Sequence, residues 1–114
     1  MIIPDNAGLG ELRQLLAQAE NELSEQTPVL TKYRTDHNNA KAEYEYELSC
    51  ARVMHQEEKT ATMMNAKAAM DVRKFQLAWK AAEANLIMGE DRVKSLQGQR
   101  DTLKTLVKSE HFSY

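Results

Sequence analysis

The sequence predicts an all-α protein: a long antiparallel helical hairpin, coiled-coil-like, with a short N-terminal helix, assembled into a homo-oligomer. Apolar residues recur every three or four positions along most of the 114 residues, which is the spacing of a helix that packs on another helix. Only two prolines and four glycines interrupt the chain, a composition that suits long helices better than a β-sandwich or a doubly wound α/β fold. At this length we expect a single helical domain over residues 1–114.

The first helix is expected at about residues 9–25, after an irregular start over residues 1–8. Its apolar stripe comprises Leu9, Leu12, Leu16, Ala19 and Leu23. Thr27-Pro28 is predicted to end this helix and to begin the next one. Threonine caps helices, and proline at the first helical position loses no hydrogen bond.

The second helix is expected at about residues 28–57. Its stripe follows heptad spacing and then slips by a four-residue step, which is a local stutter; the residues are Leu30, Tyr33, His37, Ala40 and Tyr44, then Leu48, Ala51 and His55. We expect Tyr33, Tyr44 and Tyr46 to lie along helix–helix contacts.

A turn is predicted at about residues 57–62, where polar residues interrupt the apolar pattern without a glycine or proline. Thr60 or Thr62 is a suitable cap for a third helix. The charge also changes sign there: residues 1–58 carry a net charge of −6 and residues 59–114 a net charge of +4. Opposite charges favour laying one half against the other, within a chain or between chains; the alternative is that both halves are ordinary solvated faces. The alternative to the turn itself is a continuous helical rod.

The third helix is expected at about residues 62–108 and is apolar on two faces. One stripe follows heptad spacing from Val72 to Val107, and a second runs from Met63 to Met88. A helix that is apolar on two sides is covered on two sides, so we expect the second helix on one face and another subunit on the other. The candidate oligomer-interface residues are Met63, Met70, Phe75, Leu77, Trp79, Leu86, Met88, Val93 and Leu96.

No spacing in the sequence indicates catalysis. The glycines form neither a phosphate-binding loop nor a dinucleotide turn, and no serine or cysteine has an oriented base. We therefore expect no enzyme, no catalytic residue, no cofactor, no metal ion and no small-molecule substrate. Cys50 is the only cysteine, which favours an intracellular protein, and no run of about 18 apolar residues predicts a membrane span.

Basic residues recur along one edge of the third helix at multiples of seven. Such a ribbon suits a phosphate backbone; the alternative is a solvated flank that pairs with acidic residues such as Glu43 and Glu47. The candidate nucleic-acid-binding residues are Lys59, Lys67, Arg73, Lys74, Lys80 and Lys94.

The stretch from Lys32 to Lys108 resembles the UvsY-type recombination mediators of bacteriophages. The residues that carry the resemblance are Lys32-Tyr33, His37, Lys41-Ala42-Glu43, Glu58-Lys59-Thr60, Ala69-Met70-Asp71-Val72, Leu77-Ala78-Trp79, Lys94, Arg100 and Lys104. The first 27 residues look unlike that family.

The resemblance implies a ring-like oligomer in the cytoplasm of a bacterial host that binds single-stranded DNA and helps a recombinase displace single-strand-binding protein. It places Lys67, Arg73, Lys74 and Lys80 against the DNA. The competing hypothesis is a phage coiled-coil adaptor or inhibitor that docks on a host or phage protein through the acidic first half.

Overall fold

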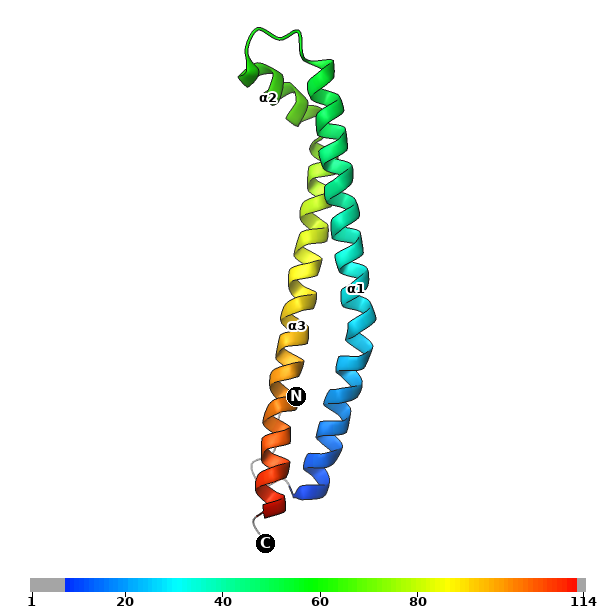
Figure 1. Ribbon diagram of the computed structural model, residues 1–114, viewed down its shortest axis with the longest axis vertical. Helices are drawn as coiled ribbons and strands as arrows, with labels where there is room; N and C mark the ends of the chain where they lie inside the picture. Colours follow the sequence, from blue (N-terminus) through cyan, green and yellow to red (C-terminus); the bar gives the residue numbers. More distant parts are fainter. Residues whose placement is uncertain (1–7, 113–114) are drawn as a thin grey trace. The chain divides into compact units, whose positions relative to one another are not determined.

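The computed structural model describes residues 8–112, and every regular element in that range is a helix (Figure 1). The elements are α1 (Leu9–Met54), α2 (Ala61–Asp71) and α3 (Arg73–Phe112). The predicted all-α class is confirmed. Of the predicted irregular start, residues 1–7 lie outside the described range. None of the helices in that range combines the length and the apolar character needed to cross a membrane.

The chain packs as two compact units. Unit 1 contains residues up to Leu30 together with those from Met88 onward, and unit 2 contains Thr31–Ile87. Helices α1 and α3 each contribute to both units. Each unit has its own apolar core.

The core of unit 1 forms between the first turns of α1 and the last turns of α3. Leu12, Ala19 and Leu103 are buried there. Leu15, Leu16, Leu106 and Val107 pack around them. Leu12, Leu16 and Ala19 belong to the stripe predicted for the first helix, so three-four spacing correctly identified the buried face of this segment.

The core of unit 2 joins the end of α1 to α2 and the start of α3. Ala51, Ala68 and Val72 are buried, with Tyr44, Leu48 and Phe75 packed around them. Farther back along α1, His37 contacts Trp79, so earlier residues of α1 meet later residues of α3. The chain therefore reverses direction within unit 2, as the predicted turn requires.

Helix α1 passes through Pro28 without a break, so the predicted division into two helices at Thr27-Pro28 is wrong. Proline in a helix interior removes one backbone hydrogen bond, but the rest of the 46-residue helix holds it in place. The side chain of Thr27 bonds backward to the carbonyl of Leu23 at 3.1 Å and does not cap a new helix. Leu23, Gln26 and Leu30 keep the stripe in register across the proline, so the sequence pattern is compatible with one continuous helix but does not require it.

The turn between α1 and α2 covers residues 55–60, and α1 ends at Met54 instead of at about residue 57. The backbone bonds tighten there to three-residue spacing, from Gln56 N to Val53 O at 3.3 Å and from Glu58 N to His55 O at 3.1 Å. Thr60 then caps α2, accepting a hydrogen bond from the backbone N–H of Met63. Of the two residues predicted as possible caps, Thr60 and Thr62, the structure confirms Thr60.

The third predicted helix is divided in two at Val72. Its backbone leaves helical geometry there (φ −106°, ψ 12°), and its N–H bonds back to Ala68 and Met70. Val72 is only 3% exposed and packs with Ala51 and Ala68. Since no glycine or proline marks this point, the local sequence did not predict the break. In unit 2, α2 is inclined to the start of α3 (Figure 1), and α3 continues to Phe112, past the predicted end at residue 108.

Candidate functional site

Five of the six basic candidates lie between residues 59 and 80, from the turn before α2 to the first turns of α3. Lys59 lies in the turn before α2, Lys67 on α2, and Arg73, Lys74 and Lys80 on the first turns of α3. All five side chains are exposed. Together they define what we call the basic segment, residues 59–80, which belongs to unit 2. The sixth candidate, Lys94, is exposed as well but belongs to unit 1.

The basic segment carries five cationic side chains and one carboxylate, that of Asp71. Asp71 is already engaged: its Oδ2 lies 2.6 Å from Nε2 of His55 at the end of α1. The positive net charge of residues 59–114 is therefore concentrated in the basic segment, which the net charges of the two halves of the sequence did not show.

The cations of the basic segment differ in how far they are already paired. Lys67 forms an ion pair with Glu58, and Lys80 lies 3.5 Å from Glu83. Lys59, Arg73 and Lys74 have no carboxylate within 4.0 Å in the described part of the chain, although Lys74 lies over the ring of Phe75. The expected alternative pairing with Glu43 and Glu47 is not among the ion pairs formed by residues 8–110.

The predicted interface residues separate into two groups. Met63 is 43% exposed, Met70 77%, Leu77 57% and Met88 62%, so the second stripe lies open. The remaining candidates lie on the covered stripe: Leu96 is buried, and the half-buried residues are Phe75, Trp79, Leu86 and Val93.

Sequence reasoning missed part of the exposed apolar surface. Ile87 on α3 is 53% exposed, and Val53 and Met54 near the end of α1 are 63% and 77% exposed. Tyr46 is 67% exposed, so its predicted place along a helix contact is wrong, whereas Tyr33 and Tyr44 are half-buried as expected. The signal for Tyr46 was its position two residues after Tyr44, on the opposite side of the helix.

The one cysteine of the sequence lies on α1. Cys50 is a half-buried free thiol, one helical turn after Tyr46. Their hydrogen bond, followed by the electrostatic effects of Cys50 and Glu47, raises the pKa of the Tyr46 phenol. Nothing in this pair points to a nucleophile with a base. Among the described residues, no group of three or more histidine, cysteine, aspartate or glutamate side chains is placed to hold a metal ion.

A shallow groove of about 290 Å³ lies at the bend between α2 and α3. Ala69 and Met70 form its apolar part, and Arg73 and Gln76 contribute polar groups. Arg73 is the member of the basic segment that combines an exposed charge with a place at this groove. An anion that reaches Arg73 thus meets an apolar surface beside it.

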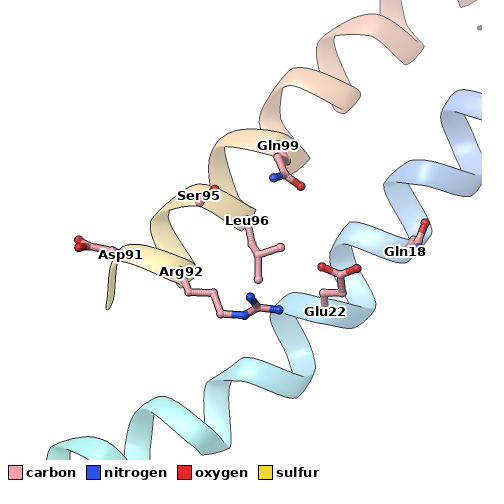
Figure 2. A pocket seen from close by; sticks show the side chains of 7 residues that line it. All are labelled: Gln18, Glu22, Asp91, Arg92, Ser95, Leu96 and Gln99. Carbon is pink, nitrogen blue, oxygen red and sulfur yellow. The ribbon is translucent and has the colours of Figure 1, made fainter. Parts of the chain in front are cut away.

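A larger polar groove of about 590 Å³ lies in unit 1, between α1 and α3. Figure 2 shows Arg92 extending from α3 toward α1, Glu22 and Gln99 facing the space between the helices, and Asp91 turned away from it. The carbonyl oxygen of the Gln99 side chain is buried and accepts no hydrogen bond. None of the predicted DNA-binding residues lines this groove, and its mixed charges favour no particular ligand.

Comparisons of the chain with protein-family models, with curated proteins and with solved structures gave no match.

Proposed function

We propose that the protein is a non-enzymatic accessory protein that binds single-stranded DNA through the basic segment. The observation that carries the proposal is the cluster of five exposed cations on residues 59–80, with Lys59, Arg73 and Lys74 lacking a carboxylate within 4.0 Å among the described residues. Unpaired cations are the groups that gain most from a phosphate backbone, because binding releases the counterions condensed on it.

The resemblance to phage recombination mediators extends the proposal to a biological role. In that role the protein assists a recombinase in replacing single-strand-binding protein on DNA. The basic segment includes four residues that the resemblance assigns to DNA, namely Lys67, Arg73, Lys74 and Lys80. Its exposed apolar neighbours, Met70 and Leu77, supply contact surface beside the charges.

The test is a titration of a fluorescently labelled single-stranded oligonucleotide by anisotropy, at low and at moderate salt. Reversing the charges with Arg73→Glu and Lys74→Glu together is expected to weaken binding at least tenfold at low salt. The slope of log affinity against log salt is expected to become shallower by about 1.4, since each lost phosphate contact contributes about 0.7 for a single strand.

A matched control reverses two exposed cations of α1 in the same unit, Arg34 and Lys41. It changes the net charge by the same amount outside the basic segment. Equal weakening by both double variants would show that net charge alone, and no particular surface, drives binding. Absence of binding by the unaltered protein at micromolar concentration and low salt would refute the proposed function.

We further propose that the protein acts as a homo-oligomer, with the exposed second stripe at the subunit interface. Met63, Met70 and Leu77 expose between 43% and 77% of their surface, and apolar patches of this kind commonly mark contact sites. Light scattering is expected to give a multiple of the 13.0 kDa chain mass. Met70→Gln with Leu77→Gln is expected to lower that mass, while Val53→Gln with Met54→Gln on α1 leaves it unchanged; a monomeric unaltered protein excludes the oligomer.

A second candidate function is that of an adaptor that docks on another protein through acidic residues. Glu11, Glu20 and Glu25 on α1 are exposed and form no ion pair with the described residues. The adaptor hypothesis predicts a protein partner that survives nuclease treatment and is lost when Glu20 and Glu25 are changed to lysine. Retention of that partner by the charge-reversed variant would contradict it.

A further inference from the structure

A histidine, a tryptophan and a glutamate meet between α1 and α3 of unit 2. Nε1 of Trp79 lies 3.2 Å from Nε2 of His37, and Oε2 of Glu83 lies 3.9 Å from the same His37 nitrogen. The His37 side chain is 18% exposed and that of Glu83 38%. His37 thus has two possible partners for one nitrogen, at the edge of the helix contact.

The chemistry of indole fixes the protonation of His37 in this arrangement. Indole N–H is a donor only, so Nε2 of His37 must accept, and the ring must be neutral with its proton on Nδ1. When the ring gains a second proton, Nε2 becomes a donor and no longer accepts from Trp79. The same nitrogen is then suited to a carboxylate, and Glu83 is the carboxylate that faces it.

Other charged groups around His37 act on this exchange. From α3, Lys80 shares Glu83 with His37: its Nζ lies 3.5 Å from Oε1 of Glu83 and 4.3 Å from the centre of the Trp79 ring. On α1 itself, Arg34 and Lys41 lie one turn before and one turn after His37, with Tyr33 four residues before it. Three cations and one carboxylate thus lie on the two helices around His37.

We propose that this contact is a pH-sensitive switch in the seam of unit 2. At neutral pH, His37 accepts the Trp79 hydrogen bond and Glu83 pairs with Lys80. At acid pH, protonated His37 donates to Glu83, the indole N–H loses its acceptor, and Lys80 loses part of its hold on the carboxylate. The switch consists of one proton taken up from water at Nε2 and one exchange of hydrogen-bond partners.

The chain contains one tryptophan, so a proton–nitrogen correlation spectrum shows a single indole N–H signal. Between about pH 8 and about pH 5, the range in which histidine is the side chain that ordinarily changes charge, that signal is expected to move upfield in one step. The His37 ring signals are expected to move with the same midpoint. At the upper end of the range, ring nitrogen shifts are expected to show the tautomer with its proton on Nδ1.

Three variants separate the switch from a merely structural contact. His37→Gln is expected to abolish the indole titration, because an amide keeps an acceptor but takes up no proton. His55→Gln, the matched control in the same unit, is expected to leave the titration in place. Glu83→Gln is expected to move the midpoint to lower pH, because the protonated state loses its anionic partner.

Two results would overturn the proposal without relying on the folding of His37→Gln. One is an indole signal in the unaltered protein that does not move between about pH 8 and about pH 5. The other is a His37 ring that carries its proton on Nε2 at the upper end of that range. If the titration midpoint of the Glu83→Gln variant equals that of the unaltered protein, Glu83 takes no part in the exchange of hydrogen-bond partners.

Discussion

The rings of Tyr44 and Trp79 stack across α1 and α3, with centroids 5.1 Å apart and an angle of 22° between the planes. Both side chains are half-buried. Stacked aromatic pairs contribute about 0.5–1.5 kcal/mol beyond the area that they bury. The pair is therefore a main contact between the two helices in unit 2, beside the small-residue packing of Ala51 and Ala68.

Tyr44→Ala is expected to lower the free energy of unfolding by about 2–4 kcal/mol, through lost burial and lost stacking. Urea unfolding followed by circular dichroism measures the change. Tyr46→Ala is the matched control, since Tyr46 is 67% exposed on the same helix, and it is expected to change stability by less than about 0.5 kcal/mol. Equal effects of the two substitutions would contradict the placement of Tyr44 against Trp79.

Leu103→Ala is expected to destabilise unit 1 by about 2–5 kcal/mol, because it leaves a cavity in a packed core. Leu103 has no exposed surface and packs with Leu12 and Ala19. Hydrogen exchange of backbone amides reports the loss locally, with faster exchange expected in the paired turns of α1 and α3. The exposed Val53→Ala serves as control and is expected to remain within about 0.5 kcal/mol of the unaltered protein.

Pro28→Ala is expected to stabilise the protein by about 1–3 kcal/mol, since proline is about 3 kcal/mol less favourable than alanine inside a helix. The substitution restores a backbone donor in the middle of α1. Thermal unfolding followed at 222 nm measures the change, with Val29→Ala as the neighbouring control. A loss of stability would argue that residues 27 and 28 divide two helices, as the sequence first indicated.

Thr60→Ala is expected to cost about 1 kcal/mol by removing the cap of α2. The Thr60 hydroxyl accepts from the backbone N–H of Met63 at 3.1 Å, and alanine leaves that donor unpaired within the protein. Hydrogen exchange at Met63 and Met64 is expected to accelerate. Thr62→Ala, inside the first turn of the same helix, should have little effect; similar effects of the two changes would place the cap elsewhere.

Gln99→Met is expected to raise the stability of unit 1 by about 1–3 kcal/mol, which is the cost of a buried polar atom without a partner. The side-chain carbonyl oxygen of Gln99 is buried between α1 and α3 without a donor. Methionine has a similar length and no strong acceptor. The control is Gln97→Met at an exposed neighbouring position, which is expected to leave the free energy of unfolding unchanged. Destabilisation by Gln99→Met would show that the Gln99 amide makes a stabilising contact.

The buried faces of α1 and α3 were predictable because side-chain direction follows from helical geometry alone, whereas the buried Ala68 of α2 belonged to no predicted stripe. The heptad stripe from Val72 to Val107 includes buried Val72, Leu96 and Leu103, and its other members are covered to varying degrees. The second stripe has the same helical spacing, yet Met70 and Leu77 are largely exposed. Periodicity identifies an apolar face, but it does not say which partner covers that face.

The candidate site was predictable in composition and not in arrangement. The spacing of Lys59, Arg73 and Lys80 was visible in the sequence. The pairing of Lys80 with Glu83 and its position over Trp79 depend on rotamers that only the packed helices select. The contact between His37 and Trp79 joins residues 42 positions apart, so no local pattern indicated it.

The sequence by itself determined the helical class and the packed faces of α1 and α3, and it indicated a turn at about residues 57–62 with a cap at Thr60 or Thr62. Each of these follows from local backbone preference or from a short repeat. Tertiary structure decided whether α1 continued through Pro28 and where the third predicted helix broke. In both places the local signal was weaker than long-range packing. The stripe on α1 stays in register across Pro28, whereas burial of Val72 against Ala51 and Ala68 accompanies a break that no residue type marks.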